Sequence, residues 1–306
     1  MSLIEQLSKR TNLPLDSIQK YAKTCPVRYK VYSIPKRNGK GFRVIAQPSA
    51  PVKALQRELV SILEDYILVH ECAMAYREGV SIFDNASKHK DNDYLLKMDF
   101  KDFFPSIDPA TVLGLIMSQC PVAEKSDTLY LLSILCRKPR GSDRFIVSIG
   151  APSSPFISNA YMYVFDDILS KLLVDKGISY TRYADDLTFS TRKKGALFEV
   201  PALVKKVLVD SGYRTIRVNE EKTVFSSKKH NRHVTGLVLT NDGRVSLGRS
   251  KKREIRTLIF KYLHGELSKP EVESLKGLAS HARHIEPEFW ERLKSKYGID
   301  DSFFKL

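Results

Sequence analysis

Apolar positions in the first 65 residues predict two short helices, a hairpin and a longer helix. Positions that share a helical face are three or four residues apart, at Leu3, Ile4 and Leu7 and again at Leu55, Leu59, Ile62 and Leu63. Ser49 and Pro51 precede the longer helix as cap and first-turn residues, and its pattern covers about five turns. Residues 29–34 and 42–46 are rich in strand-forming residues and flank Asn38-Gly39, a strong signal for a tight turn.

The middle of the chain predicts helices, a strand and a second hairpin. The strand covers residues 94–100, and the helical patterns cover residues 113–118, 127–136 and 154–174. The second hairpin joins residues 179–183 to residues 187–191 and has Ala184-Asp185-Asp186 between its strands. Two carboxylates therefore lie at the tip of this hairpin.

The last hundred residues predict a mixed segment followed by a helical tail. A helix over residues 201–211 precedes strand-like residues at 214–218 and a β pair, 234–239 with 244–247, that turns at Asn241-Asp242-Gly243. The tail has helical spacing over residues 255–263, 270–282 and 287–297. The chain contains no internal repeat, low-complexity tract or long linker, so we expect packed units throughout.

Composition indicates a globular protein that binds a polyanion. Hydrophobic residues make up 42% of the 306 residues, enough for a core, and exclude a disordered or fibrous chain. The formal net charge is +15, and it is concentrated in residues 1–50 and 228–261, each of which carries ten Lys or Arg against two acids. Such clusters are typical of nucleic-acid binding, although solubility explains part of the charge.

The cysteines and the N-terminus indicate a reducing compartment. The four cysteines lie far apart and form no CxxC pair, which argues against disulfides and a structural zinc site. The N-terminus lacks the apolar run of a signal peptide, and no apolar stretch approaches the roughly 20 residues that span a bilayer. We therefore expect a cytoplasmic protein with no membrane segment.

Three carboxylates form the strongest candidate for catalytic chemistry. Asp99 lies where a strand meets a loop, and Asp185 and Asp186 lie on the hairpin tip. Phosphoryl transfer with two Mg²⁺ ions needs such oxygen ligands on adjacent elements. A Tyr-x-Asp-Asp tetrad is expected by chance about 0.05 times in a chain of this composition, so the tetrad alone is only suggestive. We interpret the other double acid, Asp166-Asp167, as a solvated or capping face of a helix.

Four segments, taken in order, resemble the successive palm motifs of reverse transcriptases. They are Asp99-Phe100-Lys101-Asp102-Phe103-Phe104-Pro105-Ser106, Gly150-Ala151-Pro152-Ser153-Ser154-Pro155, Tyr180-Thr181-Arg182-Tyr183-Ala184-Asp185-Asp186 and Asn219-Glu220-Glu221-Lys222-Thr223. The resemblance spans roughly residues 28 to 260. It implies an α+β right-hand polymerase with fingers, a palm of antiparallel sheet plus helices, and a small helical thumb. The expected boundaries are 1–98 for the N-terminal helices and fingers, 99–240 for the palm with a fingers insertion at about 113–150, and 241–306 for the thumb.

Two narrower segments resemble signatures of bacterial retron reverse transcriptases. Asn85-Ala86-Ser87-Lys88-His89 matches their NAxxH pattern, and Val234-Thr235-Gly236 matches their VTG pattern. The resemblance implies an enzyme that copies part of a structured non-coding RNA into branched multicopy single-stranded DNA. It also implies dNTP substrates, a retron effector protein and a role in anti-phage defence. The chain ends 120 residues after Asp186, which leaves room for a thumb but not for an RNase H, maturase or endonuclease domain.

The resemblance assigns metal and proton-transfer roles. Asp99 and Asp185 are the expected direct Mg²⁺ ligands, with help from the Phe100 carbonyl and from Asp186. Two ions are expected, and Mn²⁺ can replace Mg²⁺. Lys222 resembles the palm lysine proposed to protonate departing pyrophosphate, although a lysine at a strand end is unremarkable by itself.

The resemblance also assigns the nucleotide site. Phe104 matches the family's sugar gate, where a large ring leaves no space for a 2′-hydroxyl, although a Phe-Phe-Pro run by itself is more often core. Arg43, with Lys36 and Arg37, matches the fingers hairpin that folds over the triphosphate, and guanidinium geometry suits phosphate. Gly150 begins a turn whose backbone N–H groups can face a phosphate or the template. Ile149 departs from the family, which usually has Gln there, so any contact made by that Gln is in doubt.

RNA recognition is expected at two places. The retron signatures suggest Asn85, His89, Val234, Thr235 and Gly236. A basic cluster at the start of a helix adds Lys251, Lys252, Arg253 and Arg256. Cations there oppose the helix dipole, so local helix stability does not account for them, whereas phosphate contact does. The alternatives are a solvated basic face for the cluster and an ordinary surface position for His89.

Three other functions remain open at this point. A compact reverse transcriptase related to group II introns is disfavoured by the short tail and by Asn85 and His89. An RNA polymerase also uses paired Asp residues in a palm, but Phe104 speaks against it. A noncatalytic RNA-binding scaffold would not need Asp99, Asp185 and Asp186.

Overall fold

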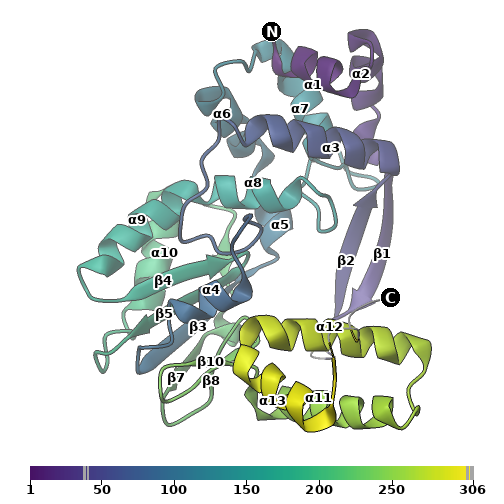
Figure 1. The fold of residues 1–306 in the computed structure, drawn as a ribbon. Helices are drawn as coiled ribbons and strands as arrows, with labels where there is room; N and C mark the ends of the chain where they lie inside the picture. The colour runs from purple at the N-terminus through teal and green to yellow at the C-terminus, as the bar shows by residue number, and fades with distance from the viewer. Residues whose placement is uncertain (37–38, 40, 301–302, 304–306) are drawn as a thin grey trace.

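The protein consists of an N-terminal helical part, a central sheet with helices, and a C-terminal helical part (Figure 1). The computed structural model describes residues 1–36, 39, 41–300 and 303. Two hydrophobic clusters hold the parts together. One joins the N-terminal helices to the central sheet, and the other is formed mainly by residues after 232. Among the described residues no helix is both long enough and apolar enough to cross a bilayer.

The N-terminal part follows the pattern predicted from the sequence. It contains α1 (Leu3–Thr11), α2 (Leu15–Ala22), η1 (Cys25–Val27), β1 (Tyr29–Pro35), β2 (Phe42–Pro48) and α3 (Ala50–Leu63). Ser2 and Glu5 close a capping box on α1. The β1–β2 hairpin is confirmed, and it extends from α3 toward the C-terminal helices in Figure 1. Helix α3 has 14 residues, fewer than five turns require, and Ser49 occupies its cap position without a side-chain bond.

The central sheet brings together strands from distant parts of the sequence. Strand β3 (Tyr94–Lys101) lies in the middle, with β5 (Asp186–Thr191) on one side and β6 (Arg217–Val218) and β7 (Val224–Ser227) on the other. Strand β4 (Ser179–Tyr183) pairs with the free side of β5. All these pairs are antiparallel. The hairpin predicted over residues 179–191 is thus confirmed.

Helices between the strands differ from prediction at one point. They are α4 (Ile82–Ser87), α5 (Phe103–Ser106), α6 (Pro109–Gln119), η2 (Lys125–Asp127), α7 (Thr128–Leu135), α8 (Ser154–Tyr161), α9 (Tyr163–Val174), α10 (Val200–Asp210) and η3 (Glu220–Lys222). The single helix predicted over 154–174 is wrong, because it breaks at Met162. The Tyr213 hydroxyl accepts from Phe165 N (3.3 Å) and donates to Tyr161 O (2.8 Å), so it replaces the helical hydrogen bond between them.

The C-terminal part contains a small sheet and three helices. Strands β8 (Arg232–Val234), β9 (Leu237–Leu239) and β10 (Val245–Ser246) precede α11 (Gly248–Leu263), α12 (Lys269–Ile285) and α13 (Pro287–Tyr297). The helical tail is confirmed. The single strand predicted over 234–239 is wrong, because the chain reverses at Thr235 (φ 47°) and Gly236 (φ 85°). Positive φ at both positions is the conformation of a two-residue hairpin turn.

Helix α4 is attached to the sheet by a buried polar network. The ring nitrogens of His89 lie 2.7 Å from Ser190 Oγ and 2.8 Å from Thr181 Oγ1, and the Thr181 hydroxyl donates to Asn85 Oδ1 (2.6 Å). Since Thr181 gives its proton to Asn85, the His89 Nε2 must donate to Thr181, which fixes the neutral tautomer. Burial lowers the pKa of His89 to about 3, so the ring stays neutral.

This network corrects the expected RNA contacts. Asn85 and His89 have no exposed surface, and Val234 is fully buried in the C-terminal hydrophobic cluster. These three side chains cannot touch RNA, because protein atoms surround them. Thr235 and Gly236 lie closer to the surface, at the β8–β9 turn.

The depressed pKa of His89 predicts acid-sensitive stability. In the unfolded chain this histidine takes up a proton near pH 6.5, whereas in the folded protein it does so near pH 3. Its contribution is therefore present above pH 6.5 and lost as the pH falls, by about 2 kcal/mol between pH 7 and pH 5. Urea unfolding at several pH values gives the free energy of unfolding as a function of pH. Between pH 7 and pH 5 this free energy should fall by about 2 kcal/mol less for His89→Gln than for wild type. Parallel curves would contradict the assignment.

Candidate active site

Strand pairing places the three predicted acids at one end of the central sheet. Asp99 in β3 lies directly opposite Asp186 in β5. The Phe100 N–H donates to the Asp185 carbonyl (3.0 Å), which ties the β4–β5 turn to β3. Asp99 is buried, Asp185 is half-buried and Asp186 is exposed. Residues 99, 185 and 186 are therefore neighbours in the folded chain.

The acids repel one another electrostatically. Burial, followed by the charge of Asp99, raises the pKa of Asp185. Loss of surrounding water and the charges of Asp185 and Asp99 raise the pKa of Asp186 to about 6. A bound cation would remove this repulsion, because it favours the ionised form of each acid.

Lys222 and Asn219 hold the carboxylate of Asp99. Lys222 Nζ lies 2.6 Å from Asp99 Oδ2, and Asn219 Nδ2 donates to Asp99 Oδ1 (3.3 Å). Burial would lower the pKa of Lys222, but the hydrogen bond to Asp99 and the nearby acids outweigh it, so the pKa is raised. Asn219 lies in one of the matched motifs but was not predicted as a site residue.

Carboxylate oxygens are the ligands that Mg²⁺ prefers, so the chemistry of the acids fits a divalent ion. In the described part of the chain, however, no group of three or more His, Cys, Asp or Glu side chains is arranged to hold a metal. The ammonium of Lys222 neutralises Asp99 instead.

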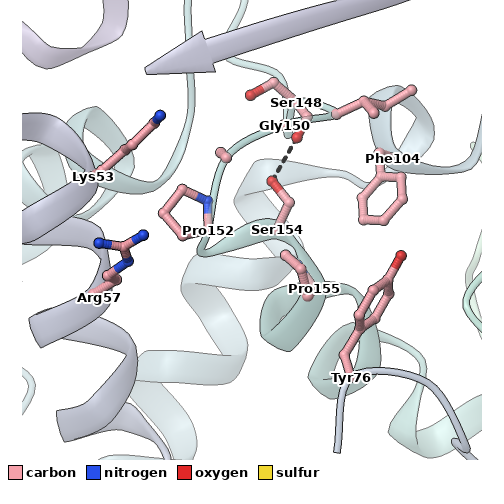
Figure 2. Close-up of a pocket in the computed structure, with 11 residues that line it drawn as sticks. Lys53, Arg57, Tyr76, Phe104, Ser148, Gly150, Pro152, Ser154 and Pro155 are labelled. Atoms are coloured by element: carbon pink, nitrogen blue, oxygen red, sulfur yellow. Dashed lines mark hydrogen bonds between the residues drawn. The ribbon is translucent and has the colours of Figure 1, made fainter. Parts of the chain in front are cut away.

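A pocket of about 320 Å³ lies beside Phe104 (Figure 2). Phe104 and Tyr76 line one side, and Lys53 and Arg57 from α3 line the opposite side. The remaining lining residues are Ser148, Ile149, Gly150, Ala151 and Pro152 in the turn before α8, and Ser154 and Pro155 in the first turn of that helix. The pocket thus has a cationic end and an aromatic end.

Gly150 allows the turn to approach the β1–β2 hairpin. Its φ is 108°, and a Cβ there would lie 3.1 Å from Ile45 Cγ2 and 3.2 Å from the Ala46 carbonyl. The Ala46 N–H donates to the Ile149 carbonyl (2.8 Å). Ile149 thus lines the pocket and joins it to β2, although its side chain cannot form a hydrogen bond.

Tyr76 connects the pocket to the acids. Its ring centroid is 6.5 Å from that of Tyr183, next to the acidic turn. Burial, followed by the charge of Asp185, raises the pKa of Tyr76. Tyr76, at the aromatic end of the pocket, is therefore within electrostatic reach of Asp185. Lys53 and Arg57 line the opposite side of the pocket (Figure 2). The sequence analysis missed Tyr76, Lys53 and Arg57, because no motif contains them.

Two of the predicted cations, Arg43 and Lys36 of the β1–β2 hairpin, are exposed. Arg43 lies on β2 opposite Ile34, and its charge opposes the effects of burial and Asp99 on the pKa of Asp185. It is therefore within electrostatic reach of the acids. Lys36 is exposed at the end of β1, and Arg37 lies outside the described residues.

The basic cluster on α11 is partly engaged within the protein. Lys252 pairs with Glu286 (2.6 Å), and Lys251 pairs with Glu254 (2.8 Å). Arg256 lies over the ring of Phe289, 5.3 Å from its centroid. The ion pair with Glu286 therefore accounts for Lys252. The sequence had predicted that this lysine contacts phosphate, because a cation at the start of a helix does not stabilise it. Arg253 and Arg256 remain exposed on the helix surface.

The interpretation of Asp166 as a solvated residue is wrong. Its carboxylate has no exposed surface and forms an ion pair with Arg182, which is also fully buried (Nη2 to Oδ2, 2.6 Å). The helical spacing in the sequence indicated that Asp166 is buried, because it shares a helical face with the apolar residues Leu169 and Leu173. Asp167 does reach the surface and pairs with Lys171 (2.8 Å).

Comparisons with known proteins agree with the geometry. The sequence model of the family described as reverse transcriptase (RNA-dependent DNA polymerase) matches residues 34–239. The retron Ec83 reverse transcriptase of Escherichia coli is 46% identical over 274 residues, 88% of this chain and 87% of that protein. The retron Ec86 reverse transcriptase of Escherichia coli is 28% identical over 306 residues, 97% of this chain and 91% of that protein.

A solved structure with a similar fold is apo telomerase from Candida tropicalis. It superposes with a TM-score of 0.52 at 14% identity, over 94% of this chain and 64% of the telomerase chain. This similarity confirms the α+β right-hand polymerase fold. The family match and the 46% identity to the retron Ec83 enzyme show that the chain belongs to the reverse transcriptases, within them to the bacterial retron enzymes, and is an RNA-directed DNA polymerase.

Proposed function

We propose that this polymerase copies part of a structured non-coding RNA into branched multicopy single-stranded DNA by two-metal nucleotidyl transfer. The observation that carries the proposal is the register that sets Asp99 opposite Asp186 and beside Asp185. The retron relatives support the choice of RNA. By the same similarity, the product acts with a retron effector protein in anti-phage defence in the bacterial cytoplasm.

Asp99 and Asp185, with the Phe100 carbonyl and Asp186, would hold two Mg²⁺ ions, for which Mn²⁺ can substitute. When bound, such ions favour deprotonation of the primer 3′-hydroxyl and neutralise the triphosphate. The primer oxygen then bonds to the α-phosphorus as the bond to pyrophosphate breaks. Lys222 is protonated and near the acids, so it can give its Nζ proton to the departing pyrophosphate.

The incoming dNTP is proposed to bind to Phe104, Arg43, Lys36 and Gly150. The ring of Phe104 lies on the same side of the pocket as Tyr76, which is within electrostatic reach of Asp185, and the sugar of a nucleotide would lie there (Figure 2). Arg43 is close enough to influence Asp185 and can pair with the triphosphate.

Lys53 and Arg57 are proposed to bind the template. They lie on the side of the pocket opposite Tyr76, which is within electrostatic reach of Asp185, whereas the triphosphate must reach the acids (Figure 2). A phosphate bound by Lys53 and Arg57 therefore belongs to the template strand and not to the incoming nucleotide. Further RNA contacts are proposed for residues outside the pocket, namely Thr235, Gly236, Lys251, Arg253 and Arg256.

The three parts of the chain are proposed to act as fingers (1–98, with an insertion at about 113–150), palm (99–240) and thumb (241–306). The second hydrophobic cluster supports a separate thumb. It also includes Val234, Leu237 and Leu239, so β8 and β9 pack with the thumb helices.

Expression with the cognate non-coding RNA tests the proposed product. Nucleic acid that copurifies with the wild-type protein should contain DNA covalently joined to RNA, and Asp185→Asn should copurify with RNA alone. The variant should lose at least about 1,000-fold in primer extension, because it loses an essential charged ligand. Its melting temperature should not fall, since the substitution relieves repulsion with Asp99. Asp167→Asn is the matched control. Normal extension by Asp185→Asn would refute the assignment.

The sugar gate predicts a change in selectivity. Phe104→Ala should increase incorporation of rNTP relative to dNTP by at least about tenfold, because the ring no longer excludes a 2′-hydroxyl. Phe104→Tyr keeps the bulk and should retain wild-type selectivity. Single-nucleotide extension with each substrate measures the ratio, and an unchanged ratio for Phe104→Ala would count against the gate.

The template proposal predicts a change in salt dependence. Lys53→Gln with Arg57→Gln should weaken binding of a template–primer and reduce the slope of log K against log salt by about 1 to 2. The KM for dNTP should stay close to wild type. The double variant Lys171→Gln, Lys176→Gln removes the same charge elsewhere and should bind normally. A raised KM for dNTP with unchanged template affinity would place the triphosphate there instead.

A further inference from the structure

Arg182 makes contacts that lead from a buried ion pair to the acidic turn. Its Nε lies 3.0 and 3.1 Å from the two carboxylate oxygens of Asp166, and its Nη2 lies 2.6 Å from Oδ2. The Tyr180 hydroxyl also donates to Asp166 (2.8 Å). Although burial alone would lower the pKa of Arg182, Asp166 raises it. The guanidinium is therefore charged and fixed.

The remaining nitrogen of Arg182 points away from Asp166. Nη1 donates to the Ala184 carbonyl (3.1 Å) and to Asn159 Oδ1 (3.2 Å). Asn159 in turn donates through Nδ2 to the Ala75 carbonyl (2.8 Å). One buried cation thus reaches the residue before Asp185 and, through Asn159, the residue before Tyr76.

Of the two positions that Arg182 reaches, Ala184 is itself strained, and Ala75 precedes the strained residue Tyr76. Ala184 has a φ of 57° and Tyr76 a φ of 59°, both in the left-handed region that L-residues disfavour. Such conformations persist only when surrounding contacts enforce them. The backbone of Arg182 adds to these contacts, because its N–H donates to the Cys72 carbonyl and its carbonyl accepts from Met74 N, both at 2.7 Å.

We infer that the Asp166–Arg182 pair is a positioning device that holds the Ala184–Asp185 turn and Tyr76 in their active arrangement. The inference rests on the proposed role of Asp185 as a metal ligand. Neither Arg182 nor Asp166 is exposed, so neither touches substrate. They act by fixing the backbone on both sides of the acid.

The double variant Asp166→Leu, Arg182→Met separates positioning from stability. Removing one partner of a buried pair leaves an uncompensated charge, whereas replacing both with apolar residues of similar size is often neutral for stability. The single variants should therefore melt at lower temperature, and the double variant should return toward wild type. The double variant still lacks the bond to the Ala184 carbonyl, so its kcat should stay at least tenfold reduced, with the KM for dNTP within threefold of wild type.

Binding of Mn²⁺, measured by electron paramagnetic resonance without turnover, gives a second readout. The double variant should bind Mn²⁺ at least fivefold more weakly, because Asp185 is no longer held. Asp167→Asn, one residue along α9, should match wild type in both assays. A folded double variant with wild-type kcat and Mn²⁺ affinity would overturn the inference and leave the pair with a structural role.

Arg182→Lys covers the case in which the double variant does not fold. Lysine keeps the charge facing Asp166, but one ammonium cannot span Asp166, Asn159 and Ala184. It should fold and show the same loss of kcat and Mn²⁺ affinity, and wild-type values would again overturn the inference. If the proposed role of Asp185 were wrong, Asp185→Asn would remain active. This result distinguishes failure of the proposed function from failure of the inference about Arg182 and Asp166.

Discussion

The antiparallel pairing of β3 with β5 is the constraint on which the rest of the structure depends. It sets Asp99 against Asp186, and like charges directly opposite each other destabilise a sheet. The pairing persists because the strands continue through buried residues such as Leu96 and Phe189, which lie opposite each other and belong to the large hydrophobic cluster. Apolar burial away from the acids thus holds together a group of charges that would otherwise separate.

Two kinds of contact then shape the acidic end of the sheet. Lys222 and Asn219 neutralise and orient Asp99 from the η3 side, and Arg182 secures the turn that carries Asp185. The Lys222 ammonium is half-exposed, so its contact with Asp99 is open to solvent. The Arg182 contacts are fully buried. The site therefore combines a buried ion pair behind the turn with a partly exposed ion pair at Asp99.

Local patterns and motifs were sufficient to predict much of this arrangement. The hairpins at 29–48 and 179–191 and the helical tail follow from alternation, helical spacing and turn residues. The proximity of Asp99 to Asp185 followed from the family motifs. Contacts between distant residues were not predictable in this way. Tyr213 breaks the helix at Met162 from about fifty positions away, and Asn85 and His89 are buried by hydroxyls about a hundred positions away. Asp166 was misread because a double acid suggests a polar surface, whereas its partner is set by tertiary packing.

The number of divalent ions that the three acids bind can be counted. The protein, bound to a template–primer that ends in a dideoxynucleotide and to the matching dNTP, can be titrated with Mn²⁺ and followed by electron paramagnetic resonance. A triphosphate alone also binds metal, so the comparison is with Asp99→Asn under the same conditions. The account predicts two tightly bound ions in the wild-type complex and fewer in the Asp99→Asn complex. Two equally tight ions in both complexes would contradict it.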